Sequence, residues 1–210
     1  MRFIGDVHGK MDRYLSLVVG ADQSIQVGDF GAGFVPLPQA HDSAMDPARH
    51  RFIRGNHDNP AVCAEHPAWI PDGTAETLPS GTRIFYLGGA TSVDRHSRVE
   101  GVEWWPDEEL SIAAGYAALD TYEAEVASAG RPFDVVVTHE CPESIARVIF
   151  KTRRDKLTDC SRTRQLLDGM LASSAPKTWI FGHWHTDIDT VIDGTRYICL
   201  AELSHIDLAL

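Results

Sequence analysis

Short apolar runs, each followed by a polar turn that contains glycine, recur along this chain. The first run covers residues 1–4. A helix is predicted next, because the apolar positions 11, 14, 15, 18 and 19 share one helical face. Two more strands are predicted at residues 24–27 and 52–53. The opening of the chain therefore predicts a strand, a helix and two further strands, in that order.

The remainder of the chain continues this alternation of strands and helices. Residues 60–80 are rich in proline and are expected to form a loop. The apolar run at 133–137 is continuous, which is typical of a strand buried on both faces. The other predicted elements are strands at 82–87 and 179–181, a hairpin formed by 190–192 and 196–200, and helices from 107 to about 128 and from 162 to 171. The pattern as a whole predicts an α/β fold.

Length and composition predict one globular domain that spans residues 1–210. The chain is somewhat longer than the ~150 residues of a typical domain, and its 43% hydrophobic and 23% charged residues are ordinary for a globular protein. No apolar run approaches the ~18 residues of a membrane-spanning helix, and the first residues lack the pattern of a signal peptide. Four scattered cysteines without a C-x-x-C pair are typical of reduced thiols, so a cytoplasmic location is expected.

The formal net charge of −11 argues against two classes of partner. A surface this acidic is unsuited to an extended nucleic-acid groove, and it also lacks the basic cluster that anchors proteins to anionic membranes. The unusual count is that of histidine, of which the chain has 10. The expected chemistry depends on how these histidines are grouped.

Polar blocks follow five of the predicted strands. They are Asp6-Val7-His8, Gly28-Asp29, Gly55-Asn56-His57-Asp58, His139, and Gly182-His183-Trp184-His185. In open α/β sheets the ligand lies beyond the carboxyl ends of the strands. The five blocks are therefore expected to converge, although they are spread over most of the sequence.

The residue types in these blocks suit transition metals. Asp6 and His8 are two positions apart and point to the same side of an extended backbone, and His183 and His185 repeat that spacing. Imidazole and carboxylate ligands without thiolate favour Mn, Fe, Zn or Ni over Cu(I) and Ca. Seven candidate ligands are too many for one tetrahedral zinc, and they suit two divalent ions that share a bridging carboxylate. Such a pair of ions can clamp a phosphoryl group.

Taken in order, the five blocks resemble those of the calcineurin-like metallophosphoesterase family. They extend from Gly5 to His185, which is most of the chain. A further stretch, Gly88 to Ser92 with Asp94 and then Trp104-Trp105-Pro106, is similar to small stand-alone bacterial and phage members. The resemblance implies an αββα sandwich of two mixed sheets flanked by helices, with a dinuclear metal site. Manganese is the first expectation for that site, with Fe, Zn or Ni as alternatives.

The resemblance also implies a role for each matching residue. The implied ligands of the first metal are Asp6, His8 and His185; those of the second are Asn56, His139 and His183; and Asp29 is the implied bridge. His57 resembles the histidine that meets the substrate without binding metal, with Asn56 beside it and Asp58 behind it.

These roles predict a phosphoesterase that acts on phosphomonoesters or phosphodiesters. Two divalent ions outweigh the charges of Asp6 and Asp29, so a phosphate is attracted in spite of the acidic surface. A metal-bound hydroxide is expected to attack phosphorus. His57 is expected to act as general acid toward the leaving oxygen or to stabilise charge there, with Asp58 orienting its imidazole.

The substrate is less well defined than the chemistry. The expected partner is a small phosphorylated compound or a nucleotide, and residues 34–50, 60–80 and 88–105 carry no readable specificity code. A protein Ser/Thr phosphatase or a dinucleoside-polyphosphate hydrolase is an alternative, as are an inactive scaffold of the same fold and a protein with one structural metal. A substrate contact is suggested for Arg54. The basic run Lys151, Arg153, Arg154 and Lys156 is expected to form a solvated face, with a phosphate contact as the alternative. The arginine that follows the second block in the protein phosphatases is missing here, because Asp29 continues as Phe30-Gly31-Ala32-Gly33-Phe34.

Overall fold

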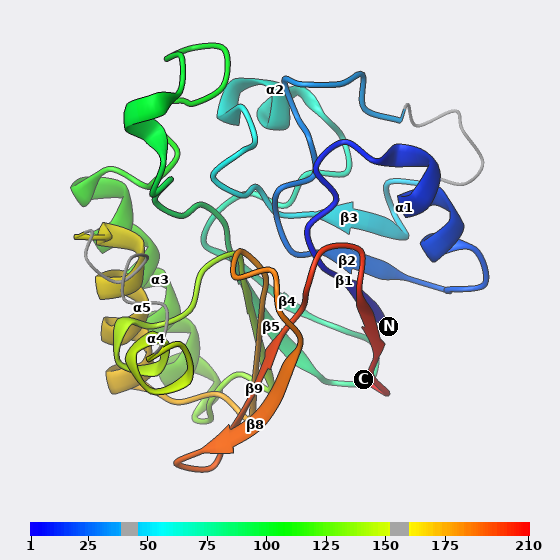
Figure 1. Cartoon of the computed structure of the whole chain (residues 1–210). Helices are drawn as coiled ribbons and strands as arrows, with labels where there is room; N and C mark the ends of the chain where they lie inside the picture. Colours follow the sequence, from blue (N-terminus) through cyan, green and yellow to red (C-terminus); the bar gives the residue numbers. More distant parts are fainter. Residues whose placement is uncertain (39–45, 152–159) are drawn as a thin grey trace.

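The chain forms two β-sheets, and the computed structural model describes residues 1–38, 46–151 and 160–210. The smaller sheet has the strand order β10-β1-β2-β3. Its strands are β1 (Arg2–Ile4), β2 (Ser24–Gln26), β3 (His50–Phe52) and β10 (His205–Asp207). The first three strands are parallel, whereas β10 is antiparallel to β1. The two ends of the chain therefore lie side by side at one edge of this sheet (Figure 1).

The larger sheet has the strand order β4-β5-β6-β7-β9-β8. Its central strands β5, β6, β7 and β9 are parallel, and both edge strands are antiparallel to their neighbours. The strands are β4 (Thr74–Thr77), β5 (Arg83–Leu87), β6 (Val135–Thr138), β7 (Thr178–Phe181), β8 (Ile188–Ile192) and β9 (Thr195–Cys199). Both sheets are therefore mixed.

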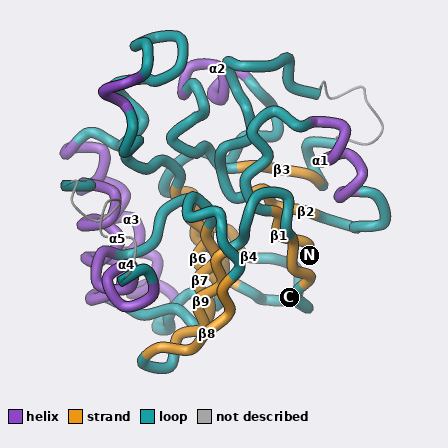
Figure 2. The backbone as a smooth tube through the Cα atoms, in the orientation of Figure 1, coloured by secondary structure: helices purple, strands orange, loops and turns teal. Residues whose placement is uncertain are grey.

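Helices cover the outer face of each sheet (Figure 2). The helices are α1 (Met11–Val18), α2 (Pro60–Glu65), α3 (Ile112–Ala129), α4 (Glu143–Ile149) and α5 (Arg162–Ser173), with a short 3-10 turn η1 (Arg95–Ser97). In Figure 1, α3, α4 and α5 lie together against the larger sheet, whereas α1 and α2 accompany the smaller one. This is the αββα sandwich that the family resemblance implies.

The main apolar core lies between the two sheets. Phe3 and Ile25 from the smaller sheet join Ile84, Val135 and Ile180 from the larger sheet in one buried cluster. Val135–Thr138 is buried at every position, which is why its apolar run is continuous rather than alternating. Two further clusters lie under the helices, one on each outer face. Each sheet is therefore packed on both faces, and the loops after its strands begin from well-packed positions.

The structure corrects the sequence predictions in two segments. Residues 60–80 are not all loop, because they include α2, which Asn59 caps and Pro60 begins, and the edge strand β4. Helix α3 starts at Ile112 rather than near residue 107. Glu108 and Glu109 precede the helix because their carboxylates are buried and accept hydrogen bonds from Ser92 and Ser161, respectively. Helix α4 and strand β10 were not predicted at all, since both are short.

No helix within the described ranges combines the length and the apolar character needed to cross a bilayer.

Candidate metal centre

The five polar blocks lie in loops that directly follow five strands. The first three blocks come after the parallel strands β1, β2 and β3 of the smaller sheet, and the last two come after β6 and β7 of the larger sheet. Parallel strands end at the same edge, so both sheets deliver their loops to one place. The structure brings all seven predicted metal ligands together there.

Left-handed backbone is concentrated in these loops. His8, Asp29, His183 and His185 have φ angles of 48°, 57°, 66° and 51°. This conformation costs a residue other than glycine on the order of 1–3 kcal/mol and persists only where the surrounding structure enforces it. Strained backbone at four candidate ligands indicates that the loops are shaped for the site rather than for local stability.

Two glycines make room for ligands that come from other loops. A Cβ atom at Gly55 would lie 2.0 Å from Asp29 Oδ1, and a Cβ atom at Gly182 would lie 2.2 Å from Asp6 Oδ1. No larger residue fits at either position without displacing a carboxylate. The glycine that opens each of these blocks is therefore required for the blocks to interlock.

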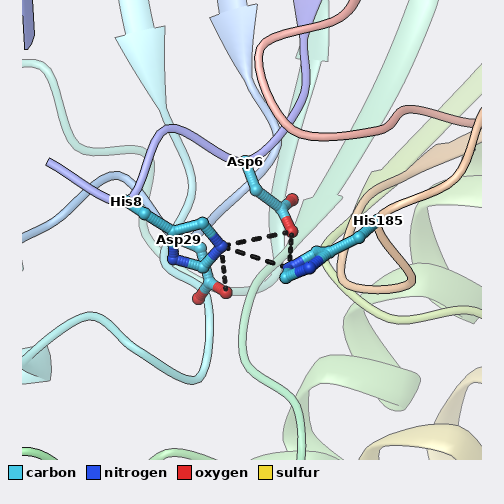
Figure 3. A group of neighbouring side chains, drawn as sticks. All are labelled: Asp6, His8, Asp29 and His185. Atoms are coloured by element: carbon cyan, nitrogen blue, oxygen red, sulfur yellow. Dashed lines mark hydrogen bonds and ion pairs between the residues drawn. The ribbon is translucent and has the colours of Figure 1, made fainter. Parts of the chain in front are cut away.

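The first group of donors consists of Asp6, His8, Asp29 and His185 (Figure 3). Their ligand atoms all lie within 4.8 Å of one another. His185 Nε2 is 3.1 Å from Asp6 Oδ2 and 3.1 Å from His8 Nε2. The carboxylates are buried, whereas the His8 and His185 side chains are 23% and 45% exposed, so this side of the site opens to solvent.

The second group of donors is formed by Asn56, His139 and His183. Asn56 Oδ1 lies 3.0 Å from His139 Nε2 and 2.9 Å from His183 Nδ1. The Asn56 amide nitrogen is held by the Ser92 hydroxyl at 2.9 Å, which turns the carbonyl oxygen toward the two imidazoles. All three residues are buried. This arrangement is the one expected of ligands that face a common centre.

Asp29 connects the two groups. Its Oδ1 atom is 3.4 Å from His139 Nε2 in the second group, and its Oδ2 atom is 3.9 Å from His8 Nε2 in the first. Oδ2 is buried and has no hydrogen-bond partner among the described residues. A buried carboxylate oxygen without a partner is costly, and a cation would satisfy it. The oxygen and nitrogen donors around it therefore fit divalent ions of the Mn, Fe, Zn or Ni type.

Asp29 and His139 also shift each other's pKa. Burial alone would raise the pKa of Asp29, but the charge of His139 and a hydrogen bond from it hold that pKa well below its usual range. Burial alone would lower the pKa of His139, and the Asp29 carboxylate instead raises it to about 10. The two side chains thus form a buried ion pair. A metal ion that binds His139 has to displace this proton, so metal binding is expected to release protons.

Glu140 is a site residue that the sequence analysis missed. Its buried carboxylate lies 3.6 Å from His183 Nε2 and accepts a hydrogen bond from the Trp184 indole at 2.7 Å. Arg164 lies on its other side, with Nη1 at 3.4 Å. Since Nε2 of His183 faces Glu140, Nδ1 is the nitrogen that faces the metal group. The only sequence signal was an acidic residue directly after His139.

Asp58 has a different role from the one expected. Its carboxylate accepts hydrogen bonds from the backbone N–H groups of Phe30, Gly31, Ala32 and Gly55 at 2.7–3.0 Å. Both of its oxygens are used in this way, and neither orients the His57 ring. Asp58 therefore ties the loop that carries Asp29 to the loop that carries Asn56, and the prediction that it supports His57 is wrong.

His57 lies at the mouth of the site, half-buried, with its ring centroid 5.6 Å from that of His8. Its backbone N–H donates to Asp29 Oδ1 at 2.8 Å, which fixes its position relative to the shared carboxylate. Burial lowers the pKa of its imidazole, Asp29 opposes that effect, and the positive charge of Arg98 adds to it. The ring lies beside the first group of donors and does not belong to it.

Arg54 is not placed to contact a substrate. The residue is 3% exposed, and its guanidinium binds Asp72 Oδ2 at 2.7 Å and donates to the backbone carbonyl oxygens of Asp107 and Glu108. The prediction that it grips phosphate is therefore wrong, and its role is to hold the loop before α3. In the predicted basic run, Arg153, Arg154 and Lys156 lie outside the described residues.

Asp58→Asn is expected to lower the free energy of unfolding by about 3 kcal/mol, because an amide group would face backbone donors with hydrogens of its own. Urea unfolding in the presence of a chelator measures this. The matched control is Asp46→Asn, an exposed carboxylate that accepts one hydrogen bond from Ala48, for which a change within about 0.5 kcal/mol is expected. A similarly small change for Asp58→Asn would contradict the anchoring role.

Glu140→Gln is expected to weaken Mn²⁺ binding by about 10- to 100-fold, since the carboxylate fixes the His183 ring. Competition with a fluorescent chelator measures the affinity. Glu143→Gln is the control, because Glu143 also pairs with Arg164 but does not contact His183. Equal losses in the two variants would mean that Glu140 acts only through Arg164.

Comparisons with known proteins agree with this geometry. Residues 2–187 match the calcineurin-like phosphoesterase family. The comparison with curated proteins finds no match. Among solved structures, a protein of Thermus thermophilus is similar at a TM-score of 0.56 with 12% identity, over 96% of this chain and 89% of that one. The phosphopantetheinyl hydrolase of Mycobacterium tuberculosis is similar at a TM-score of 0.51 with 15% identity, over 96% and 89%.

At these identities the solved structures show the shared fold alone. The family match covers most of the chain and includes all five polar blocks. The chain therefore belongs to the calcineurin-like phosphoesterase family.

Proposed function

We propose that this protein is a metal-dependent phosphoesterase with a dinuclear site. The observation that carries this proposal is the position of Asp29, a buried carboxylate with one oxygen near each group of donors and with Oδ2 lacking a hydrogen-bond partner among the described residues. One cation in each group would satisfy both oxygens. A single ion in the first group would leave the convergence of Asn56, His139 and His183 without a purpose.

In this proposal each donor has one assignment. The first ion is held by Asp6, His8 and His185, the second by Asn56, His139 and His183, and Asp29 bridges them. When bound, two divalent ions would supply positive charge for a phosphate and activate a water molecule. Manganese is the first metal to test.

His57 is proposed to act at the leaving oxygen of the substrate. The hydrogen bond from its backbone N–H to Asp29 holds the residue next to the metal group, and the ring is left free to meet a substrate. A phosphate dianion near the ring would favour the charged imidazolium, which then donates its proton or stabilises negative charge. Asn56 is proposed to contact the substrate as well, at the inner side of the site.

The proposed substrates are phosphomonoesters or phosphodiesters of small molecules, nucleotides included. No observation favours a phosphoprotein or a dinucleoside polyphosphate over these. We also propose that residues 1–210 form one domain and that the protein works in the cytoplasm. The four cysteines, all of them among the described residues, are free thiols, and Cys63, Cys141 and Cys199 are buried, which suits a reducing compartment.

Asp29→Asn is expected to reduce the bound metal from about two ions per chain to one or fewer, because an amide is a weak bridging ligand. Elemental analysis after gel filtration of Mn²⁺-loaded protein measures the count. Asp193→Asn, in the turn between β8 and β9, is the control. An unchanged count would remove Asp29 from the bridge, and about one ion in the unaltered protein would favour a single structural metal.

His57→Ala is expected to retain its metal and to lose turnover by at least about 100-fold. The assay is a Mn²⁺-loaded screen of monoesters, diesters and nucleotides. The loss should be greater for alkyl phosphates, which need protonation of the leaving oxygen, than for nitrophenyl phosphate, which does not. His205→Ala, an exposed histidine in β10, is the control. Equal losses for both leaving groups would exclude His57 as the acid.

A further inference from the structure

The loop after β5 reaches the candidate metal centre, although no ligand comes from it. Because β5 is parallel to β6 and β7, residues 88–94 leave the larger sheet at the same edge as His139 and His183. Ser92 is buried, its hydroxyl accepts the hydrogen bond from the Asn56 amide, and its backbone N–H donates to Glu108 at 2.9 Å. The start of this loop is therefore fixed against the second group of donors.

Six residues after Ser92, the loop presents Arg98. Asp94 and Arg98 stand at either end of the turn η1 and form a two-pronged ion pair, with Nε–Oδ1 at 2.8 Å and Nη2–Oδ2 at 2.7 Å. The turn is closed by Ser97, whose backbone N–H and hydroxyl both donate to the Asp94 carbonyl oxygen. The Arg98 side chain is 27% exposed, so it is held in place and still accessible. Within the described residues, its Nη1 group has no hydrogen bond.

The guanidinium lies within electrostatic reach of the site. Its charge contributes to the lowered pKa of His57, and Asp29 adds to the raised pKa of Arg98, which its pairing with Asp94 mainly causes. These mutual effects agree with the tether from Asn56 through Ser92 to Asp94. The hydrogen bond between Asn56 and Ser92, two residues before Asp94, keeps the turn that carries Arg98 attached to the second group of donors.

Other cations near the five blocks are already engaged. Arg54 is buried against Asp72, and Lys10, which follows the first block, pairs with Glu202. Arg95 lies on the same turn as Arg98, but its Nη1 is directed at Glu108, 3.9 Å away. This chain also lacks the phosphate-gripping arginine after the second block. Arg98 is paired as well, but its Nη1 group has no hydrogen bond among the described residues, so Arg98 is the candidate for that task.

We propose that Arg98, held by Asp94, binds a terminal phosphoryl oxygen of the substrate beside His57 and so favours phosphomonoesters over phosphodiesters. This inference rests on the proposed function. A monoester has three terminal oxygens, whereas a diester has two. The cations and Asn56 would occupy two oxygens in either case, and only a monoester offers a third to the free N–H groups of Arg98. A charged, geometrically fixed hydrogen bond of this kind is among the stronger ones in proteins.

The test measures phosphate binding apart from turnover. Inorganic phosphate is titrated into Mn²⁺-loaded protein by calorimetry, and KM is measured for matched aryl monoester and diester substrates. Arg98→Ala is expected to weaken phosphate binding by about tenfold or more and to raise KM for the monoester by a similar factor. KM for the diester should change by less than about threefold. Arg95→Ala, on the same turn, is the matched control and should resemble the unaltered protein.

Two further variants separate contact from scaffolding. Asp94→Ala releases the guanidinium without removing it, so its loss of phosphate affinity should be smaller than that of Arg98→Ala. Equal losses would mean that the pair only braces the loop and would overturn the proposal. Arg98→Lys keeps the positive charge but loses the several N–H groups of the guanidinium. Its phosphate affinity should therefore lie between those of Arg98→Ala and the unaltered protein. Arg98→Lys replaces Arg98→Ala as the test if the alanine variant does not fold. A phosphate affinity of Arg98→Lys equal to that of the unaltered protein would also count against the proposal.

The controls distinguish this inference from the proposed function. If the unaltered, Mn²⁺-loaded protein neither binds phosphate nor hydrolyses any ester, the proposed function itself fails. The other case is that the unaltered protein binds phosphate and hydrolyses an ester. In that case only the assignment of Arg98 fails if Arg98→Ala behaves like the unaltered protein, or if its KM rises equally for monoesters and diesters.

Discussion

The site is organised around one carboxylate that the fold buries without satisfying it. Asp29 is almost completely inaccessible, stays ionised beside His139, and leaves Oδ2 without a hydrogen-bond partner among the described residues. A charge in that position is unfavourable unless a cation offsets it. The surrounding loops bring imidazole, carboxylate and amide groups to the same point. The arrangement of the candidate metal centre therefore fits a cation that would offset the buried charge of Asp29.

The support for this arrangement comes from contacts between loops rather than within them. Asp58 binds the backbone of two different blocks, Gly55 and Gly182 leave space for carboxylates of other blocks, and Glu140 holds the ring of His183. Each ligand loop is therefore shaped by its neighbours. This mutual support explains how four candidate ligands keep left-handed backbone. It also means that the loops form a single unit, so a substitution in one block is expected to displace residues in the others.

The five polar blocks can be recognised in the sequence because their signals are local. A glycine and an acid or a histidine directly after an apolar strand can be recognised without coordinates, and so can the spacing of His183 and His185. The strands β5, β6 and β7 and the helix α5 were predicted for the same reason. The limits of α3 were less clear, because acidic residues before a helix are equally compatible with its first turn and with buried tertiary contacts.

The residues that the sequence analysis missed or misassigned act over long separations. Asp58 was assigned to its neighbour His57, but its partners are the amides of residues 30–32 and 55. Arg54 resembled a phosphate ligand, but its partners are Asp72 and the chain before α3. Glu140 carried no pattern beyond its place after His139. The role of such a buried polar group depends on which residue forms its hydrogen bonds. A single sequence does not show which residue that is.

The pairing of β1 with β10 has a consequence for the stability of the candidate site. The loop after β1, which carries Asp6 and His8, is hydrogen-bonded to residues 203 and 204 just before the last strand. The order of the loop that carries Asp6 and His8 therefore depends on a segment that is remote from it in the sequence. Local opening of β10 would therefore loosen Asp6 and His8 while the larger sheet stays folded, and the proposed metal site would weaken without global unfolding.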